Sequence, residues 1–187
     1  METQFDISKL IKSGKIQNEL DLERALIADR KLRVLSKKDL KFKSLRTKLR
    51  DLIEQYESKN WSDESKFSDE KLHESNTAES IAEKERLFFL RRKELIREKL
   101  KKLDLTQQDF GRILGHQSKS YTSELINGLS PFSLKDLIVI NQVFSIDLID
   151  LIPAFLTQVD KNKIRTSIKK LNNPKLKLDT GNLALVE

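Results

Sequence analysis

Apolar residues between residues 105 and 153 recur at the spacing of short amphipathic helices. They form three successive groups, each on one helical face: Phe110, Ile113 and Leu114; Leu125 and Ile126; and Leu134, Leu137 and Ile138. Gly115 follows the first group and Asn127-Gly128 follows the second, and both residue types tolerate the left-handed backbone that ends a helix. The pattern therefore predicts three helices in succession, with a tight turn between the first two.

Polar residues mark the starts of these helices. Thr106 precedes the first helix, and Asp109 follows at the spacing of a capping box. Ser118 and Ser133 stand in the N-cap position before the second and third helices. Gly111 has no side chain, which lets the first two helices cross closely. A helix, a tight turn and a second helix of this length form a helix-turn-helix, whose second helix enters the major groove of DNA.

The same stretch resembles a known family in the order of its motifs. LTQQDF, LG, SELING and PFSL follow one another as in the phage-repressor-like helix-turn-helix family (Cro/C1, XRE), and within it the HigA-type antitoxins. The resemblance covers about a quarter of the chain, and LIEQYE upstream is similar to a segment of such antitoxins. It implies a five-helix DNA-binding domain, a homodimer on an inverted-repeat operator, repression of its own operon, and a partner toxin that is a HigB-like mRNA-cleaving ribonuclease.

The second helix of the motif supplies the residues expected to read bases. Burial of Thr122, Leu125 and Ile126 leaves five side chains outward: Lys119, Ser120, Tyr121, Ser123 and Glu124. Lysine donates to guanine, serine bonds either kind of base edge, and tyrosine packs on a thymine methyl or bonds a phosphate. The glutamate either accepts from cytosine N4 or only pairs with a nearby cation. Contacts to the DNA backbone are assigned to Ser118 and, from the resemblance, to Gln107 and Asn127.

The N-terminal region, residues 1–61, carries an apolar stripe along its last helix. The stripe consists of Leu45, Leu49, Leu52, Ile53 and Tyr56. Two helices bury only one seam between them, so this surface must pack on something else. One hypothesis makes the stripe a toxin-binding surface. The alternative, which we favour, is a helical hairpin packed only for stability.

Charge divides the chain into blocks. The net charge of +7 is made up of +5 over residues 1–60, −4 over 61–86, +4 over 87–128 and +2 over 129–187. The acidic, Ser-rich stretch from 62 to 80 has few apolar residues, so we expect a flexible linker there.

Two basic clusters flank this linker. The segment from Arg30 to Arg50 has ten basic residues and one acid, Asp39. It either extends a phosphate-binding footprint or meets an acidic partner, or it is the solvated face of two helices, which is the interpretation we prefer. In the helix before the motif, Ile96, Leu100 and Leu103 are expected inward and the basic residues outward: Arg91, Arg92, Arg97, Lys99, Lys101 and Lys102.

Composition narrows the classes of function. The chain has no cysteine, which excludes disulfides and thiolate metal sites and fits a reducing cytoplasm. No apolar run approaches the ~20 residues of a membrane helix, and the first residues lack the apolar core of a signal peptide. His73 and His116 lie far apart, and there is no Gly-rich phosphate loop. We therefore expect a cytoplasmic protein with no enzymatic activity, no cofactor, no metal site and no membrane partner.

These observations predict an all-α protein in four parts. They are an N-terminal helical region (1–61), an acidic flexible linker (62–80), a helix-turn-helix domain (81–156), and a tail (157–187) with a helix and a short β-hairpin at KLKLDTGNLALV. The expected function is a DNA-binding repressor that acts as the antitoxin of a type II toxin–antitoxin pair. The alternatives are a helix-turn-helix regulator without a toxin, and a protein-interaction module that has lost DNA binding.

Overall fold

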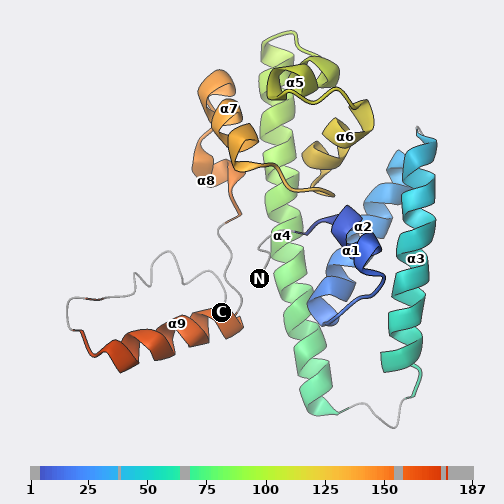
Figure 1. Ribbon diagram of the computed structural model, residues 1–187, viewed down its shortest axis with the longest axis vertical. Coiled ribbons are helices and arrows are strands. Elements are labelled where there is room, and N and C mark those ends of the chain that lie inside the picture. Colours follow the sequence, from blue (N-terminus) through green and yellow to red (C-terminus); the bar gives the residue numbers. More distant parts are fainter. Residues whose placement is uncertain (1–4, 38, 64–67, 154–157, 174–175, 177–187) are drawn as a thin grey trace. The chain divides into compact units, whose positions relative to one another are not determined.

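The computed structural model describes residues 5–37, 39–63, 68–153, 158–173 and 176. The chain divides into two compact units, residues 1–153 and residues 154–187, and each is described by itself. All regular secondary structure in the described residues is α-helical, which confirms the predicted class (Figure 1). None of the helices in the described ranges is long and apolar enough to cross a membrane.

Three capped helices open the first unit. They are α1 (Ile7–Ser13), α2 (Glu19–Leu35) and α3 (Leu40–Asn60). Each begins after a residue whose side chain accepts a backbone N–H of the first turn: Asp6, Asn18 and Asp39, respectively. Helix α1 ends at Gly14, whose φ of 70° is a left-handed conformation suited to glycine.

The N-terminal core forms where these three helices meet. It contains the buried side chains of Ile7, Ile16, Leu22, Ala25, Ala28, Leu32, Phe42, Leu49, Leu52, Ile53 and Leu129. Polar pairs join the helices at its edges. The Arg46 guanidinium of α3 bonds the Asp29 carboxylate of α2 at 2.8 Å, and Glu19 accepts from the hydroxyl of Tyr56 at 2.8 Å. The apolar stripe of α3 is therefore part of a folded core.

Helix α4 (Asp69–Lys102) is shared by both halves of the unit. Its first half packs on α2, where Ala78 and Ala82 are buried and Arg24 bonds Glu85 at 2.5 Å. The expectation of a flexible linker over residues 62–80 is wrong for residues 69–80, which are helical. Ala78 and Ala82, which lie among the acidic residues, provide small buried contacts that the composition alone did not indicate.

A second core surrounds the other half of α4. Helices α5 (Gln107–Leu114), α6 (Lys119–Asn127), α7 (Leu134–Phe144) and α8 (Leu148–Leu151) enclose it (Figure 1). The buried residues are Ile96, Leu100, Phe110, Leu114, Leu125, Ile126, Phe132, Leu137, Ile140, Phe144, Ile146 and Leu151. The Phe110 ring lies at its centre, with its centroid 6.3 Å from that of Phe132 and 5.4 Å from that of Phe144.

One cation of α4 is buried between the aromatic rings. Arg92, expected outward, is 1% exposed, whereas Leu103, expected inward, is half exposed. The Arg92 guanidinium carbon lies 4.8 Å from the Phe89 ring and 4.9 Å from the Phe132 ring, and Nη1 donates to the Leu151 carbonyl at 3.1 Å. Nε and Nη2 make no hydrogen bond. Desolvation lowers the pKa of Arg92 to about 10.

The second unit contains helix α9 (Gln158–Leu171). Its residues Lys169 and Lys170 lie in the last turn, where cations favour the negative end of the helix dipole. The predicted β-hairpin at residues 175–186 lies outside the described residues, apart from Leu176.

Candidate nucleic-acid interface

Local hydrogen bonds fix the two helices of the motif. Thr106 and Asp109 form the predicted capping box at the start of α5, with each side chain accepting from the other residue's backbone N–H. Gly115 ends α5 with φ 86°, and Ser118 caps α6 by accepting from the N–H of Tyr121 at 3.2 Å. These contacts confirm the helix-turn-helix predicted from the sequence.

The two motif helices cross at a glycine. A Cβ added to Gly111 would lie 2.5 Å from Thr122 Oγ1, inside van der Waals contact. The predicted packing role of Gly111 is thus confirmed. Because α5 and α6 touch here, the angle between them depends on the absence of a side chain at this position.

The turn between the helices is attached to α7 by a histidine. His116 Nε2 lies 3.0 Å from Asp136 Oδ1, and the other carboxylate oxygen of Asp136 accepts from the Ser133 backbone and hydroxyl. The ring of Tyr121 meets the His116 ring edge-on, with centroids 5.1 Å apart. Desolvation and then the charge of Asp136 raise the pKa of Tyr121. His116 and Asp136 are positioning residues that the sequence did not single out.

Several predicted DNA contacts lie on the accessible start of the motif. Lys119 and Ser118 are exposed, Tyr121 is 36% exposed, and Gln107 and Ser123 are partly exposed. Lys119 and Ser118 lie at the N-terminal end of α6, where backbone N–H groups are free to meet an anion. This end carries the chemistry that a recognition helix needs.

Glu124 was expected on the exposed face, and that expectation is wrong. Glu124 is 2% exposed. One oxygen pairs with the Lys41 ammonium of α3 at 2.7 Å, and the other accepts from the Ser130 hydroxyl at 3.1 Å. A buried carboxylate needs such partners because desolvation of an unpaired charge is costly. The cation comes from a helix 83 positions away in sequence, so α6 alone could not reveal it.

Ser120 is also engaged by the N-terminal helices. Its hydroxyl donates to Asp39 Oδ2 at 2.5 Å. This bond and a second one from the backbone N–H of Lys41 lower the pKa of Asp39. A carboxylate therefore lies beside the first turn of α6, among the residues expected to meet bases.

Asn127 is held at the opposite end of α6. Its backbone carbonyl accepts from Lys31 of α2 at 2.9 Å, and its side-chain oxygen accepts from Lys93 of α4 at 2.8 Å. Burial is the main cause that lowers the pKa of Lys31 to about 8, and the neighbouring charge of Lys93 adds to it. The side-chain oxygen that was expected to face the DNA backbone is bonded to Lys93.

Sequence reasoning missed the residues that reach α6 from the N-terminal region: Lys31, Asp39, Lys41 and, from α4, Lys93. The one signal in the sequence was the excess of basic residues from Arg30 to Arg50, a segment in which Asp39 is the only acid. This excess of basic residues indicated an unusual surface, but it did not indicate that the surface lies against α6.

The proposed toxin-binding stripe does not form a free surface. Leu49, Leu52 and Ile53 are buried in the N-terminal core, and Leu45 and Tyr56 are partly buried against it. Tyr56 also donates its hydroxyl to Glu19. The periodicity was real, and α1 and α2 supply the partner face of the stripe, with Leu22 of α2 buried in the same core.

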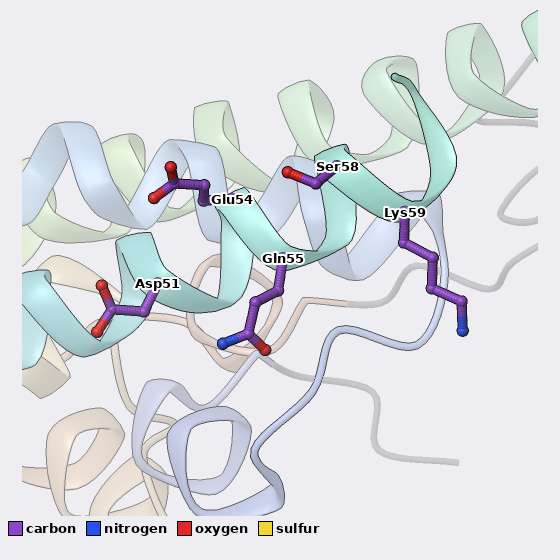
Figure 2. Close-up of a pocket in the computed structure, with 5 residues that line it drawn as sticks. All are labelled: Asp51, Glu54, Gln55, Ser58 and Lys59. Atoms are coloured by element: carbon purple, nitrogen blue, oxygen red, sulfur yellow. The ribbon is translucent and has the colours of Figure 1, made fainter. Parts of the chain in front are cut away.

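A surface depression runs along the outer side of α3 (Figure 2). Its polar lining residues come from that one helix, and in the figure their side chains spread apart instead of converging: Asp51, Glu54, Gln55, Ser58 and Lys59. The described residues contain no group of histidine, cysteine and acidic side chains placed to hold a metal ion. The α6 surface is thus the better candidate for a functional site.

Comparison with known proteins identifies the motif region. Residues 96–151 match the family model described as helix-turn-helix (HTH_3), which is of the Cro/C1 type. No curated protein and no solved structure matches the chain. The matched segment runs from the second half of α4 to the end of α8. It supports a DNA-binding transcriptional regulator.

Proposed function

We propose that this chain is a transcriptional repressor that binds an inverted-repeat operator as a homodimer, with α6 as its recognition helix. The observation that carries the proposal is the helix-turn-helix match over residues 96–151, on a segment whose α5–turn–α6 geometry is fixed by caps. Lys119 and Tyr121 at the accessible end of α6 supply a cation and an aromatic ring for base edges and phosphates.

A dimer has a candidate surface on α7 and α8. Six apolar side chains there are exposed: Leu134, Ile138, Val143, Leu148, Ile149 and Ile152. Such a cluster of exposed apolar residues is typical of an interaction surface. On an inverted repeat, the two recognition helices of such a dimer must lie in successive major-groove turns.

The test of DNA binding is a titration at two salt concentrations. Labelled duplex from the chain's own promoter should bind, and the affinity should fall steeply with salt because each neutralised phosphate releases counterions. Lys119→Ala should reduce discrimination between promoter and random duplex by ~1–3 kcal/mol, the value of one good base contact. Gln107→Ala, the matched control, should weaken both duplexes similarly. Binding that is absent or indifferent to salt would contradict the proposal.

A finer proposal is that the repressor is the antitoxin of a toxin–antitoxin pair, with a HigB-like ribonuclease as partner. Its support is the resemblance of the LTQQDF, LG, SELING and PFSL motifs to HigA-type antitoxins. Because Leu49, Leu52 and Ile53 are buried, we expect a toxin to bind elsewhere than on that stripe. Co-expression with the neighbouring reading frame tests this proposal. A neighbour that is harmless without this chain would favour the alternative, a regulator with no toxin.

A further inference from the structure

We infer that the N-terminal helices α1–α3 are an intramolecular cover on the recognition helix, which must move aside before Ser120 and Glu124 can meet bases. The inference rests on the proposed DNA-binding function and adds a regulatory step to it. In the arrangement described here, the N-terminal region and DNA compete for the same side chains of α6.

The first support is the set of contacts made by the start of α3. Asp39 and Lys41 bond two of the five side chains expected to read bases, Ser120 at 2.5 Å and Glu124 at 2.7 Å. Each pair is chemically complementary, because the Lys41 ammonium pairs with the Glu124 carboxylate and the Asp39 carboxylate accepts from the Ser120 hydroxyl. The first turn of α3 therefore fits this face of α6 chemically as well as by position.

The second support is the attachment at the other end of α6. Leu129, which follows the helix, is fully buried in the N-terminal core. The Ile7 N–H donates to the Leu129 carbonyl at 2.9 Å, and Lys31 donates to the Asn127 carbonyl. Helices α1, α2 and α3 thus each contribute a contact, and the cover holds both ends of α6.

The size and the negative charge of this cover both oppose DNA binding. The major groove is about 12 Å wide and admits one helix, whose diameter with side chains is about 10–12 Å. With the first turn of α3 bonded to it, α6 is too wide to enter fully. The Asp39 carboxylate would also lie where phosphates approach, and like charges repel.

The exposed cations near this contact could instead serve DNA directly, and the two models predict opposite effects of one substitution. Lys41→Glu places two carboxylates together where Lys41 now pairs with Glu124. If Lys41 holds the cover, the variant should bind promoter duplex about tenfold more tightly, because more of the protein is open. If Lys41 contacts phosphate, the same variant should bind more weakly.

Lys43→Glu is the matched control. Lys43 is exposed two residues further along α3, and the charge change is identical. It should weaken binding slightly through lost long-range attraction. Equal weakening by Lys41→Glu and Lys43→Glu would overturn the inference. Failure of every form to bind duplex DNA would overturn the proposed function, on which the inference depends.

A disulfide that locks the cover in its closed position provides a second test. The chain has no cysteine, so Asp39→Cys with Ser120→Cys introduces a single pair of thiols at the contact. Oxidised full-length protein should bind the promoter duplex at least about tenfold more weakly than the same variant after reduction. Each single-cysteine variant should respond to neither treatment. Equal affinity of the double variant in its disulfide-bonded and reduced forms would contradict the cover.

Hydrogen exchange reports the movement itself. The Ile7 amide is bonded to the Leu129 carbonyl only while α1 is docked. Adding promoter duplex to the unmodified protein should therefore accelerate exchange at Ile7, although binding usually protects a protein. Unchanged or slower exchange there would show that DNA binds with the cover in place, and would overturn the inference.

Discussion

The two cores on α4 differ in the contacts that supplement their helix caps. In the helix-turn-helix core, α5, α6 and α7 are each capped by a side chain bonded three residues along the chain, around a centre of aromatic rings. The N-terminal helices are capped as well, but their core adds partly buried ion pairs between helices, Arg46 with Asp29 and Arg24 with Glu85. Local bonds make each short helix less dependent on its neighbours. Long-range bonds leave a buried group without its partner whenever one side is removed.

The largest effect is expected at the centre of the helix-turn-helix core. Phe110→Ala removes a fully buried ring that contacts Phe132 and Phe144, and should cost about 3–5 kcal/mol of unfolding free energy in urea denaturation. Ile113→Ala, in the same helix but 40% exposed, should cost much less. Similar losses for the two variants would mean that caps, and not the aromatic centre, stabilise this region.

A polar substitution should show the dependence of the N-terminal core on distant partners. Glu19→Ala leaves the Tyr56 hydroxyl and the Trp61 indole N–H without their acceptor, which should cost about 1–3 kcal/mol. Glu19→Gln keeps an acceptor oxygen and should cost less. Thermal unfolding of both variants measures the difference. A Glu19→Gln variant as unstable as Glu19→Ala would assign the stability to the negative charge instead.

A cap in the helix-turn-helix region should matter less. Ser133→Ala removes the hydroxyl that accepts from the Asp136 N–H at 3.1 Å, and should cost about 1 kcal/mol. Ser133→Thr preserves an oxygen in the same place and should retain most of the stability. If Ser133→Ala cost as much as Phe110→Ala, the capping bonds could not be regarded as local.

A pH dependence is expected at the boundary of the two cores. Lys31 has a pKa of about 8 in the folded protein, mainly because it is buried, whereas an unfolded lysine has a pKa of about 10.4. Between these values the unfolded chain binds the extra proton, so stability should rise with pH. Chemical denaturation of the unmodified protein and of Lys31→Met from pH 7 to pH 10 measures this gain as a difference. A constant difference would contradict it.

The short-range features of the fold were the predictable ones. The capping box at Thr106 and the N-caps at Ser118 and Ser133 were predicted because each cap and its partner lie within one helical turn. The left-handed positions at Gly115 and Gly128 followed from the same local chemistry. The helix-turn-helix was therefore within reach of the sequence alone.

The missed features all depend on partners that sequence spacing does not bring together. Glu124 has the position of an exposed residue on α6, yet Lys41 and Ser130 allow it to be buried. Arg92 was expected outward because it is charged, yet it lies on the same face of α4 as Ile96 and Leu100, and the rings of Phe89 and Phe132 surround it. For Glu124, a second segment covered the face that the periodicity left open, whereas for Arg92 the spacing indicated burial and only the charge argued against it.

The number of residues in α4 determines how the two cores are rotated relative to each other about the axis of this helix. Each residue of an α-helix adds about 1.5 Å and turns it by about 100°. Ala82 is buried where α4 packs on α2, and Ile96 belongs to the other core. One residue inserted between them would swing the N-terminal helices more than a quarter turn around α4 and would separate α1 and α2 from Leu129 and Asn127, which they now contact. The match of Asp39 with Ser120 therefore depends on the number of residues in α4.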